Sequence, residues 1–224
     1  MQPLRVSVIV LLAIAPLFAQ PVAAPGVHPI SGRRIAQVMG WQGAEWLERS
    51  ERISEEAPDK ALDALGALAG LTVADVGAGS GYFTVRLATR VGAKGRVYAN
   101  DLQPEMLKML AARVARENIV NVTLVHGAID DPKLPPSSLD LVLMVDVYHE
   151  FSEPQKMLRA IGAALKPGGR LVLLEYRKED ADVPIRFEHK MSVAEAKLEV
   201  EAEGFTLSRV DGRLPRQHIL IFSK

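Results

Sequence analysis

The sequence of 224 residues contains no cysteine, and this absence removes several kinds of chemistry. Disulfide bonds, thiolate metal sites and a cysteine nucleophile within the chain are excluded. Net charge is also missing, because 27 lysines and arginines balance 27 aspartates and glutamates. Without a basic excess there is no electrostatic argument for nucleic acid as a partner. We therefore expect a small-molecule ligand, and the sequence predicts no metal site.

Long apolar runs are scarce, and the one near the N-terminus is short. Residues 6–19, VSVIVLLAIAPLFA, follow Arg5, and no charged residue occurs again until Arg33. A run of this length suits the core of a secretory signal and falls short of the roughly 20 residues that span a bilayer. Residues 1–24 are therefore interpreted as a signal peptide for export to the periplasm or the medium. An uncleaved hydrophobic tail on a cytoplasmic protein is the alternative, and no membrane insertion is expected beyond this segment.

Residues 25–70 are predicted to form an N-terminal arm followed by helices, ahead of a main domain at residues 71–224. Three prolines and two glycines make residues 20–32 a linker or an irregular arm. Helices are expected within residues 33–40, 44–56 and 59–68, with Asp59 capping the last and Gly70 ending it. Trp41 and Trp46 are expected to pack these helices onto the main domain.

After Gly70, short apolar runs alternate with amphipathic segments. Strands are expected at residues 71–77, 95–101, 121–127, 139–146 and 170–176. Helices are expected at residues 82–92, 104–118 and 152–165. The fourth strand is apolar almost throughout, as expected for a strand that is buried on both faces. This order predicts an α/β fold with a Rossmann-like, doubly wound and mostly parallel sheet.

The C-terminal part changes pattern. A helix is expected at residues 192–204, with Ser192 and Glu195 spaced as a capping box, and Ser152 and Gln155 have the same spacing before an earlier helix. Strands at 205–211 and 218–223 are joined by only six residues, which favours an antiparallel hairpin over another crossover. The complete sheet is therefore predicted to have seven strands.

The stretch VADVGAGSGYFT, residues 73–84, places three glycines at the end of the first strand. Glycine there allows a sharp turn and a close approach of the backbone to a ligand. The spacing of Gly77, Gly79 and Gly81 is G-x-G-x-G, which differs from the dehydrogenase and P-loop patterns. Asp75 adds a negative charge before the loop, and it favours a ligand with a cationic end over a pyrophosphate.

Two further strand ends offer binding groups. Asp101 lies twenty residues beyond Gly81 (101 − 81) and suits a bidentate grip on two ribose hydroxyls; a turn residue that caps the following helix is the alternative. After the third strand, the backbone of Ala128 and Ile129 is placed to pair with an adenine edge, with Ile129 against the ring face. An ordinary strand-to-loop turn explains these two residues equally well.

The fourth strand ends in MVDVYHEF, residues 144–151, where Asp146, Tyr148, His149 and Glu150 cluster. The ordinary pKa range of histidine suits proton transfer near neutrality, although a local hydrogen-bonding role is as well supported. Glu175 and Tyr176, at the end of the fifth strand, are candidates for the same pocket. Residues 176–192 are interpreted as a solvated loop, with a lid over the pocket as the alternative.

With these motifs in order, residues 71–177 resemble the core of a class I S-adenosylmethionine-dependent methyltransferase. VADVGAGSGYF resembles the acidic glycine-rich signature of that family, NDLQPEML its second motif, VDVYHEF its fourth-strand motif, and LKPGGRLVL its turn into the fifth strand. The resemblance implies S-adenosylmethionine as the cofactor. It places cofactor contacts at Asp75, Gly77, Ala78, Gly79, Gly81, Tyr82, Asp101, Leu102, Ala128, Ile129 and Asp146.

One position departs from the family pattern. Many members have an aspartate where this chain has Ala128, so the resemblance does not assign the adenine amino group to that position, and Asp130 is the alternative. The arm before the shared core resembles an N-terminal extension of bacterial methyltransferases with uncharacterised substrates.

The resemblance implies methyl transfer to a small-molecule acceptor. His149 is the first candidate for a general base, and Tyr148 and Glu150 are candidates for orienting the base or contacting the substrate. A binding or regulatory protein that keeps the cofactor fold without chemistry is the main alternative. A nicotinamide-dependent oxidoreductase is disfavoured by the glycine spacing. The acceptor and the oligomeric state are not predicted.

Overall fold

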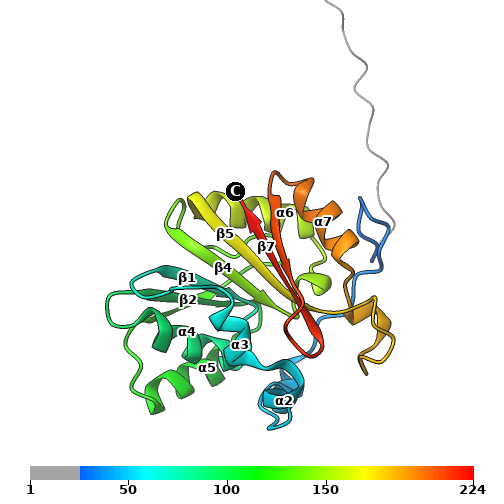
Figure 1. The fold of residues 1–224 in the computed structure, drawn as a ribbon. Helices are drawn as coiled ribbons and strands as arrows, with labels where there is room; N and C mark the ends of the chain where they lie inside the picture. Colours follow the sequence, from blue (N-terminus) through cyan, green and yellow to red (C-terminus); the bar gives the residue numbers. More distant parts are fainter. Residues whose placement is uncertain (1–25) are drawn as a thin grey trace, which may run out of the picture.

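Seven strands form one sheet that lies between two layers of helices (Figure 1). The computed structural model describes residues 26–224, so the predicted signal segment at residues 1–24 lies outside the described residues. The strand order across the sheet is β3-β2-β1-β4-β5-β7-β6. The strands are β1 (Thr72–Val76), β2 (Arg96–Asp101), β3 (Val122–His126), β4 (Leu139–Val145), β5 (Leu165–Tyr176), β6 (Thr206–Asp211) and β7 (Gln217–Ser223).

The strand pairing confirms the predicted doubly wound sheet. β1 pairs in parallel with both β2 and β4, so strand order reverses beside it, with Asp75 opposite Ala99 on one side and Leu143 on the other. β7 is antiparallel to both β5 and β6, which confirms the C-terminal hairpin. Ligands of such sheets bind beyond the carboxyl ends of the strands, near the point of reversal.

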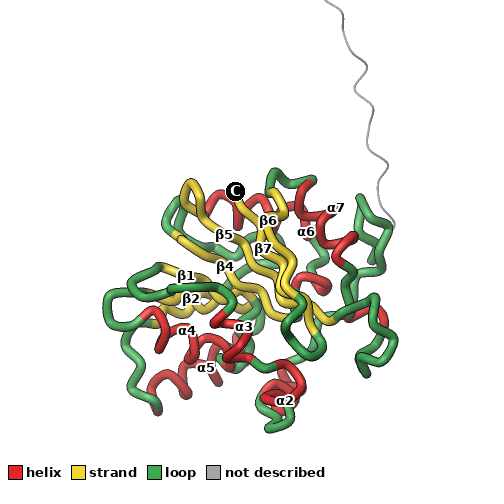
Figure 2. Tube along the Cα trace, in the orientation of Figure 1, coloured by secondary structure: helices red, strands yellow, loops and turns green. Residues whose placement is uncertain are grey.

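Helices cover both faces of the sheet, as Figure 2 shows in red around the yellow strands. The α-helices are α1 (Ala44–Leu47), α2 (Arg52–Glu56), α3 (Pro58–Asp63), α4 (Tyr82–Val91), α5 (Pro104–Arg116), α6 (Pro154–Ala164) and α7 (Val193–Glu201). Short 3₁₀ turns are η1 (Trp41–Gly43), η2 (Tyr148–Glu150) and η3 (Phe187–His189). No helix in the described part of the chain is long and apolar enough to cross a membrane.

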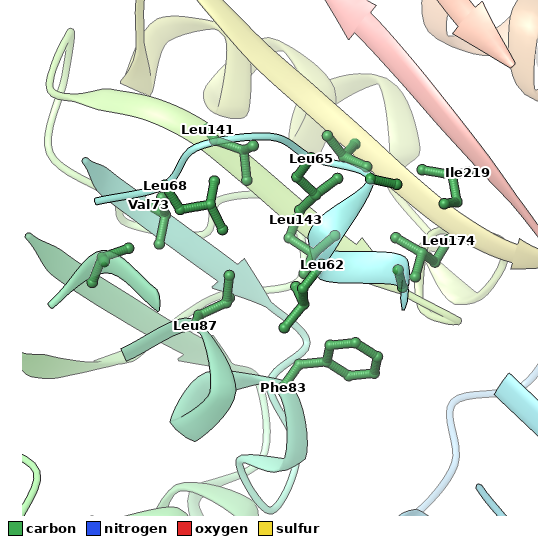
Figure 3. Packing of buried hydrophobic residues seen from close by; sticks show 14 of the residues in the cluster. Leu62, Leu65, Leu68, Val73, Phe83, Leu87, Leu141, Leu143, Leu174 and Ile219 are labelled. Carbon is green, nitrogen blue, oxygen red and sulfur yellow. The ribbon is translucent and has the colours of Figure 1, made fainter. Parts of the chain in front are cut away.

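Two apolar cores hold the helices to the sheet. On one face, Leu62 of α3 and Leu87 of α4 pack with Leu141, Leu174 and neighbouring residues of the strands (Figure 3). On the other face, residues of α6 and α7 pack with the alternate residues of β4, β5 and β7. β4 contributes to both cores, and its residues 141–144 have no exposed surface. This confirms the sequence-based expectation of a strand buried on both faces.

The helix predicted at residues 33–40 is wrong. This segment is extended, because its polar groups bond to distant parts of the chain in place of a helical ladder. The amide of Ile35 donates to the carbonyl of Gly26, and the amide of Ala36 donates to the carbonyl of His149. The helix predicted at 44–56 is divided into α1 and α2. Residues 26–40 therefore form an arm without a helix, with a turn at residues 29–31, that lies against the segment after β4.

One of the three predicted helix caps is confirmed. Ser192 and Glu195 form the capping box that begins α7. Asp59 does not cap α3, because Pro58 already holds the first helical position and the Asp59 carboxylate pairs with Arg90 of α4. Ser152 and Gln155 form no capping box at α6, since the Gln155 amide donates to Glu203.

Candidate functional site

A cavity of about 760 Å³ opens at the carboxyl ends of β1, β2 and β4. Its wall is built from three sources: the strand ends, the N-terminal arm with α1 and α2, and the loop before η3. The strand ends contribute Val76, Gly77, Gly79, Asn100, Asp101, Leu102, Gln103, Ala128, Ile129, Val145, Asp146, Val147, His149, Glu150 and Tyr176, among others. The wall therefore joins the glycine loop to the polar cluster after β4.

Gly77 and Gly79 form the turn of this wall after β1, and both need to be glycine. Their φ angles of +73° and +56° lie in the left-handed region that side chains disfavour. A Cβ atom on Gly77 would lie 2.4 Å from Val147 Cγ2, and one on Gly79 would lie 2.7 Å from Leu47 Cδ1. The glycines thus bring the backbone itself to the cavity surface.

Four of the predicted cofactor contacts lie behind this wall and do not line the cavity: Asp75, Ala78, Gly81 and Tyr82. The Tyr82 ring packs between the guanidinium groups of Arg52 and Arg86, at 4.3 and 3.9 Å from its centroid. Asp75 Oδ2 accepts a 2.6 Å hydrogen bond from the Thr84 hydroxyl of α4. These residues hold the glycine loop and the start of α4 in place from the side away from the cavity.

Burial raises the pKa of Asp75 to about 6, and this makes a prediction for folding stability. At pH values between the ordinary carboxyl pKa and 6, the folded form holds a proton that the unfolded form releases, so raising the pH favours unfolding. Relative to Asp75→Asn, the wild type should lose about 3 kcal/mol of unfolding free energy between pH 3.5 and pH 7. Urea unfolding of both proteins at the two pH values measures this; a constant difference would contradict it.

Asp101 connects the glycine loop to the segment after β2. Its Oδ2 accepts from the Gly79 amide and its Oδ1 from the Gln103 amide, each at 2.8 Å. Burial raises its pKa, and the backbone hydrogen bonds act in the opposite direction. The alternative of a simple helix cap is not seen, because α5 has no side-chain cap. Each oxygen keeps a lone pair that is free to accept a ligand hydroxyl.

The expected adenine-binding residues line the cavity beside Asp101. Leu102 and Ile129 are 41% and 53% exposed, so both offer apolar surface at the cavity wall. Ala128 also lines the wall, whereas Asp130 does not. Asp130 lies instead 4.0 Å from Lys156.

Asp146 directly follows β4 and has a left-handed φ of +52°. Its Oδ2 accepts a 2.7 Å hydrogen bond from Gln217, while its buried Oδ1 has no partner among residues 26–224. Burial raises its pKa well above the usual range, and the negative charges of Glu56 and Glu175 add to this. A buried acceptor without a partner at a cavity wall is a place for a ligand that donates hydrogen bonds.

His149 and Glu150 meet His189 of the opposite loop at one end of the cavity. His149 Nδ1 lies 2.6 Å from Glu175 Oε2, and its Nε2 lies 3.1 Å from His189 Nδ1. Glu150 accepts from the Met39 amide of the arm, and burial raises its pKa to about 7. Glu175 is fully buried and does not line the cavity; it orients the imidazole from behind.

The predicted substrate contact of Tyr148 is wrong. Tyr148 is fully buried in the apolar core, and its hydroxyl lies 3.5 Å from His28 Nε2, away from the cavity. The 3₁₀ turn η2 turns consecutive side chains in different directions. Tyr148 consequently faces the core, while His149 and Glu150 face the cavity.

The N-terminal helices supply a cluster that sequence reasoning missed. Glu56 Oε2 accepts from Arg52 at 2.6 Å, and its Oε1 accepts from Arg49 at 2.7 Å and from the Tyr176 hydroxyl at 2.8 Å. All four residues line the cavity. The spacing of Arg52 and Glu56, four residues apart, was a visible signal for an ion pair on one helix face. It gave no indication that this pair lies against β5.

The two tryptophans do not pack the helices onto the domain as expected. Trp41 and Trp46 are 40% and 49% exposed. Trp46 lines the cavity, and its ring stacks on the Arg49 guanidinium, with 3.7 Å between the guanidinium carbon and the ring centroid. The apolar surface of Trp46 thus contributes to the cavity rim rather than to the core.

Residues 177–191, called the lid below, line one side of the cavity, in the place that the lid alternative gives them. The segment is also largely exposed, with Phe187 at 67%, as the solvated-loop interpretation expects. Pro184, Ile185, Arg186 and His189 line the cavity. The base of this segment is closed by hydrogen bonds from Met191 to Tyr176 and from Lys178 to Met191, at 3.0 and 3.2 Å. Val183, Lys190 and Met191 are buried.

Comparisons with known proteins agree with this geometry. Residues 73–169, from β1 into β5, match the model of a methyltransferase domain family. A ubiquinone/menaquinone biosynthesis C-methyltransferase of a Marinomonas species is 31% identical over 119 residues. That match covers 53% of this chain and 47% of the relative, so the chain spans about half the length of the curated relatives it matches.

Solved structures extend the likeness to the fold. A SAM-dependent methyltransferase from Aquifex aeolicus is 29% identical with a TM-score of 0.77, over 83% of this chain and 98% of that one. An S-adenosylmethionine-dependent methyltransferase from Mesorhizobium loti shares the fold at 19% identity and a TM-score of 0.61, over 83% and 100% of the two chains. The first of these likenesses includes residues beyond the family model.

Proposed function

Since the chain belongs to the class I S-adenosylmethionine-dependent methyltransferases, we propose that it transfers a methyl group to a small-molecule acceptor bound beside His149. The observation that carries this proposal is that one cavity contains two groups of residues. Gly77, Gly79 and Asp101 line one part of its wall, and His149 and Glu150 line another. A cofactor held by the first group faces an acceptor held by the second. The acceptor end is also closed by the lid and by the arm.

The residues present fit S-adenosylmethionine. Asp101 accepts from the two ribose hydroxyls, and Leu102 and Ile129 provide apolar surface for the adenine. The unpaired Oδ1 of Asp146 suits the ammonium group of the methionine portion. Arg52 supplies a positive charge for the carboxylate of that portion. These assignments use Asp101 of β2, Arg52 of α2, and three residues that follow strands: Leu102 after β2, Ile129 after β3 and Asp146 after β4.

In methyl transfer from S-adenosylmethionine the main role of the protein is to position the two reactants. The bound cofactor supplies a methyl group on a positively charged sulfur, which an acceptor displaces in line. The protein holds the two reactants together, an effect worth roughly 7–11 kcal/mol when the geometry is good. His149 Nε2 receives the proton of an acceptor that carries one, and Glu175 stabilises the resulting imidazolium. Lid residues Pro184 and Ile185 keep water out.

A small acceptor is supported by the dimensions and charge of the site. The cavity of about 760 Å³ lies within the usual range for small ligands, and the cofactor takes up part of it. The balanced charge of the chain gives no electrostatic argument for a polyanionic acceptor. We propose an acceptor with one protonated oxygen, nitrogen, sulfur or acidic carbon.

The cofactor assignment is tested by Asp101→Ala. Losing two charge-assisted hydrogen bonds of about 1.5 kcal/mol each should raise the Kd for S-adenosylmethionine about 100-fold in titration calorimetry. Asp101→Asn, which retains one acceptor, should fall between this variant and the wild type. Asp130→Ala is the matched control, because Asp130 lies off the cavity wall, and its affinity should equal that of the wild type.

Two results would contradict the proposal. No binding of S-adenosylmethionine or S-adenosylhomocysteine by the wild type would remove the cofactor assignment. Binding without transfer of labelled methyl to any extract fraction of the source cells would instead favour the regulatory alternative.

We also propose that residues 1–24 direct export, as their apolar pattern predicts. Mass-spectrometric mapping of the mature N-terminus in the source cells tests this, and an intact Met1 would contradict it.

A further inference from the structure

Three side chains with metal-binding atoms converge where the lid meets the end of β4. His149 Nε2 lies 3.1 Å from His189 Nδ1 and 3.9 Å from Glu150 Oε1, and the last two atoms are 3.7 Å apart. Metal bonds of about 2.1 Å in tetrahedral geometry place neighbouring ligand atoms about 3.4 Å apart. The three distances lie on either side of this value, so a single ion fits between the three atoms with small side-chain adjustments.

The position of the ring proton on His149 leaves Nε2, the nitrogen that faces His189, free to bind a metal. Nδ1 faces the Glu175 carboxylate at 2.6 Å, and this contact places the ring proton on Nδ1. Nε2 therefore presents a lone pair toward His189 and Glu150. A histidine whose second nitrogen donates to a buried carboxylate is the usual arrangement at metal sites, because the carboxylate fixes the ring and raises its basicity.

We propose that His149, Glu150 and His189 bind one divalent first-row transition metal ion through these three atoms. Two imidazole nitrogens and one carboxylate oxygen suit Zn²⁺ or Fe²⁺, whereas Mg²⁺ and Ca²⁺ prefer oxygen ligands alone. Three protein ligands leave at least one coordination position, and all three residues line the cavity. The open position therefore faces the acceptor.

The ion would select the acceptor class, and this part rests on the proposed function. With the ion bound, His149 Nε2 is a ligand and no longer acts as the base. An acceptor that binds the ion through oxygen, nitrogen or sulfur has a lowered pKa and releases its proton to water. The bond from that atom to the methyl carbon then forms as the carbon–sulfur bond of the cofactor breaks, and neutral S-adenosylhomocysteine sulfur remains. His189 lies 40 residues beyond His149, which is why no sequence motif predicted the site.

The competing explanation is a hydrogen bond without metal, in which protonated His189 Nδ1 donates to His149 Nε2. Only the metal-site explanation predicts that the protein binds zinc when neither cofactor nor acceptor is present. Zinc chloride titrated into untagged, chelator-treated protein should bind at one ion per chain. His189→Ala and Glu150→Gln should each weaken zinc binding by more than about 100-fold, since even changes to groups that only hydrogen-bond metal ligands reduce affinity about 10- to 100-fold.

His218→Ala is the matched control. His218 also pairs with a carboxylate, Glu179, at 2.8 Å, but it lies off the cavity wall, so zinc affinity should be unchanged. Thermal unfolding of each variant checks that it folds. If a histidine variant is unstable, Glu150→Gln still tests the site, because glutamine has nearly the same shape as glutamate. Zinc binding that is equal in the wild type and His189→Ala would overturn the metal site. S-adenosylmethionine titrated into the same samples reports separately on the proposed function.

Discussion

Replacing His149 with glutamine should slow methyl transfer by a factor of about 10²–10⁴ and leave S-adenosylmethionine affinity unchanged. Glutamine has a hydrogen-bonding group but neither accepts a proton near neutrality nor replaces imidazole as a metal ligand. The variant therefore loses the function of this residue in either role, as a base or as a ligand. Affinity is preserved because His149 lies at the acceptor end, beyond the glycine loop and Asp101.

The two carboxylates nearest to His149 are poorly placed to substitute for it. Glu175, the partner of His149, is fully buried behind the imidazole, and Glu150 is held by the Met39 amide of the arm. Single-turnover transfer of labelled methyl, into the extract fraction that the wild type methylates, measures the rate. His218→Gln changes a histidine with a similar carboxylate partner outside the cavity and should keep the wild-type rate. An unchanged rate for His149→Gln would mean that the reaction needs His149 neither as a base nor as a ligand.

Replacing Arg33 with methionine should lower the free energy of unfolding by about 3–5 kcal/mol. Arg33 Nε and Nη2 donate to the two carboxylate oxygens of Glu199 in α7, each at 3.0 Å, and both side chains are almost completely buried. Burial lowers the pKa of Arg33, but the hydrogen bonds to Glu199 outweigh it and the pKa is raised. Methionine leaves a buried carboxylate without its cation, which is the source of the large effect.

The arm also positions the active site. Arg33 Nη1 donates to the carbonyl of His149 at 3.0 Å, and Ala36 donates to the same carbonyl. Loss of Arg33 should therefore reduce turnover as well as stability, even below the unfolding temperature. Without this arm, the carbonyl of His149 would lose both donors.

Urea unfolding measures the stability change. Arg90→Met is the matched control, because Arg90 pairs with Asp59, which is 70% exposed, and a surface ion pair contributes about 0–1 kcal/mol. The double variant Arg33→Met/Glu199→Met should recover most of the loss, since two apolar side chains leave no buried charge. If Arg33→Met and Arg90→Met were equally stable, the arm would not be anchored by this pair.

Much of the fold followed from local patterns. Apolar runs of five to seven residues between amphipathic helices give parallel strands, because both faces of such a strand must be covered. The short link between β6 and β7 permits only an antiparallel pairing. G-x-G-x-G after β1 identified the loop at the cavity, since left-handed backbone at Gly77 and Gly79 needs no information from the rest of the chain.

The misplaced residues share a physical cause. Tyr148 follows β4 as closely as His149 does, and only the 3₁₀ turn η2 decides that its ring enters the core. Residues 33–40 have a helical pattern, but the fully buried carboxylate of Glu199 and the carbonyl of His149 bind this segment as an extended chain. In both cases partners far away in the sequence outweigh a local preference worth only tenths of a kcal/mol per residue.

The sequence by itself determined the order of strands and helices, the glycine loop and the carboxylate at Asp101, because each depends on spacing within one segment. Only the tertiary structure decided which groups meet at the acceptor end. His149, Glu175 and His189 come from η2, β5 and η3, and Arg52 and Glu56 reach Tyr176 from a separate helix. Chain folding brings these side chains within hydrogen-bonding distance, and no periodicity in the sequence records a contact between residues 40 or 120 positions apart.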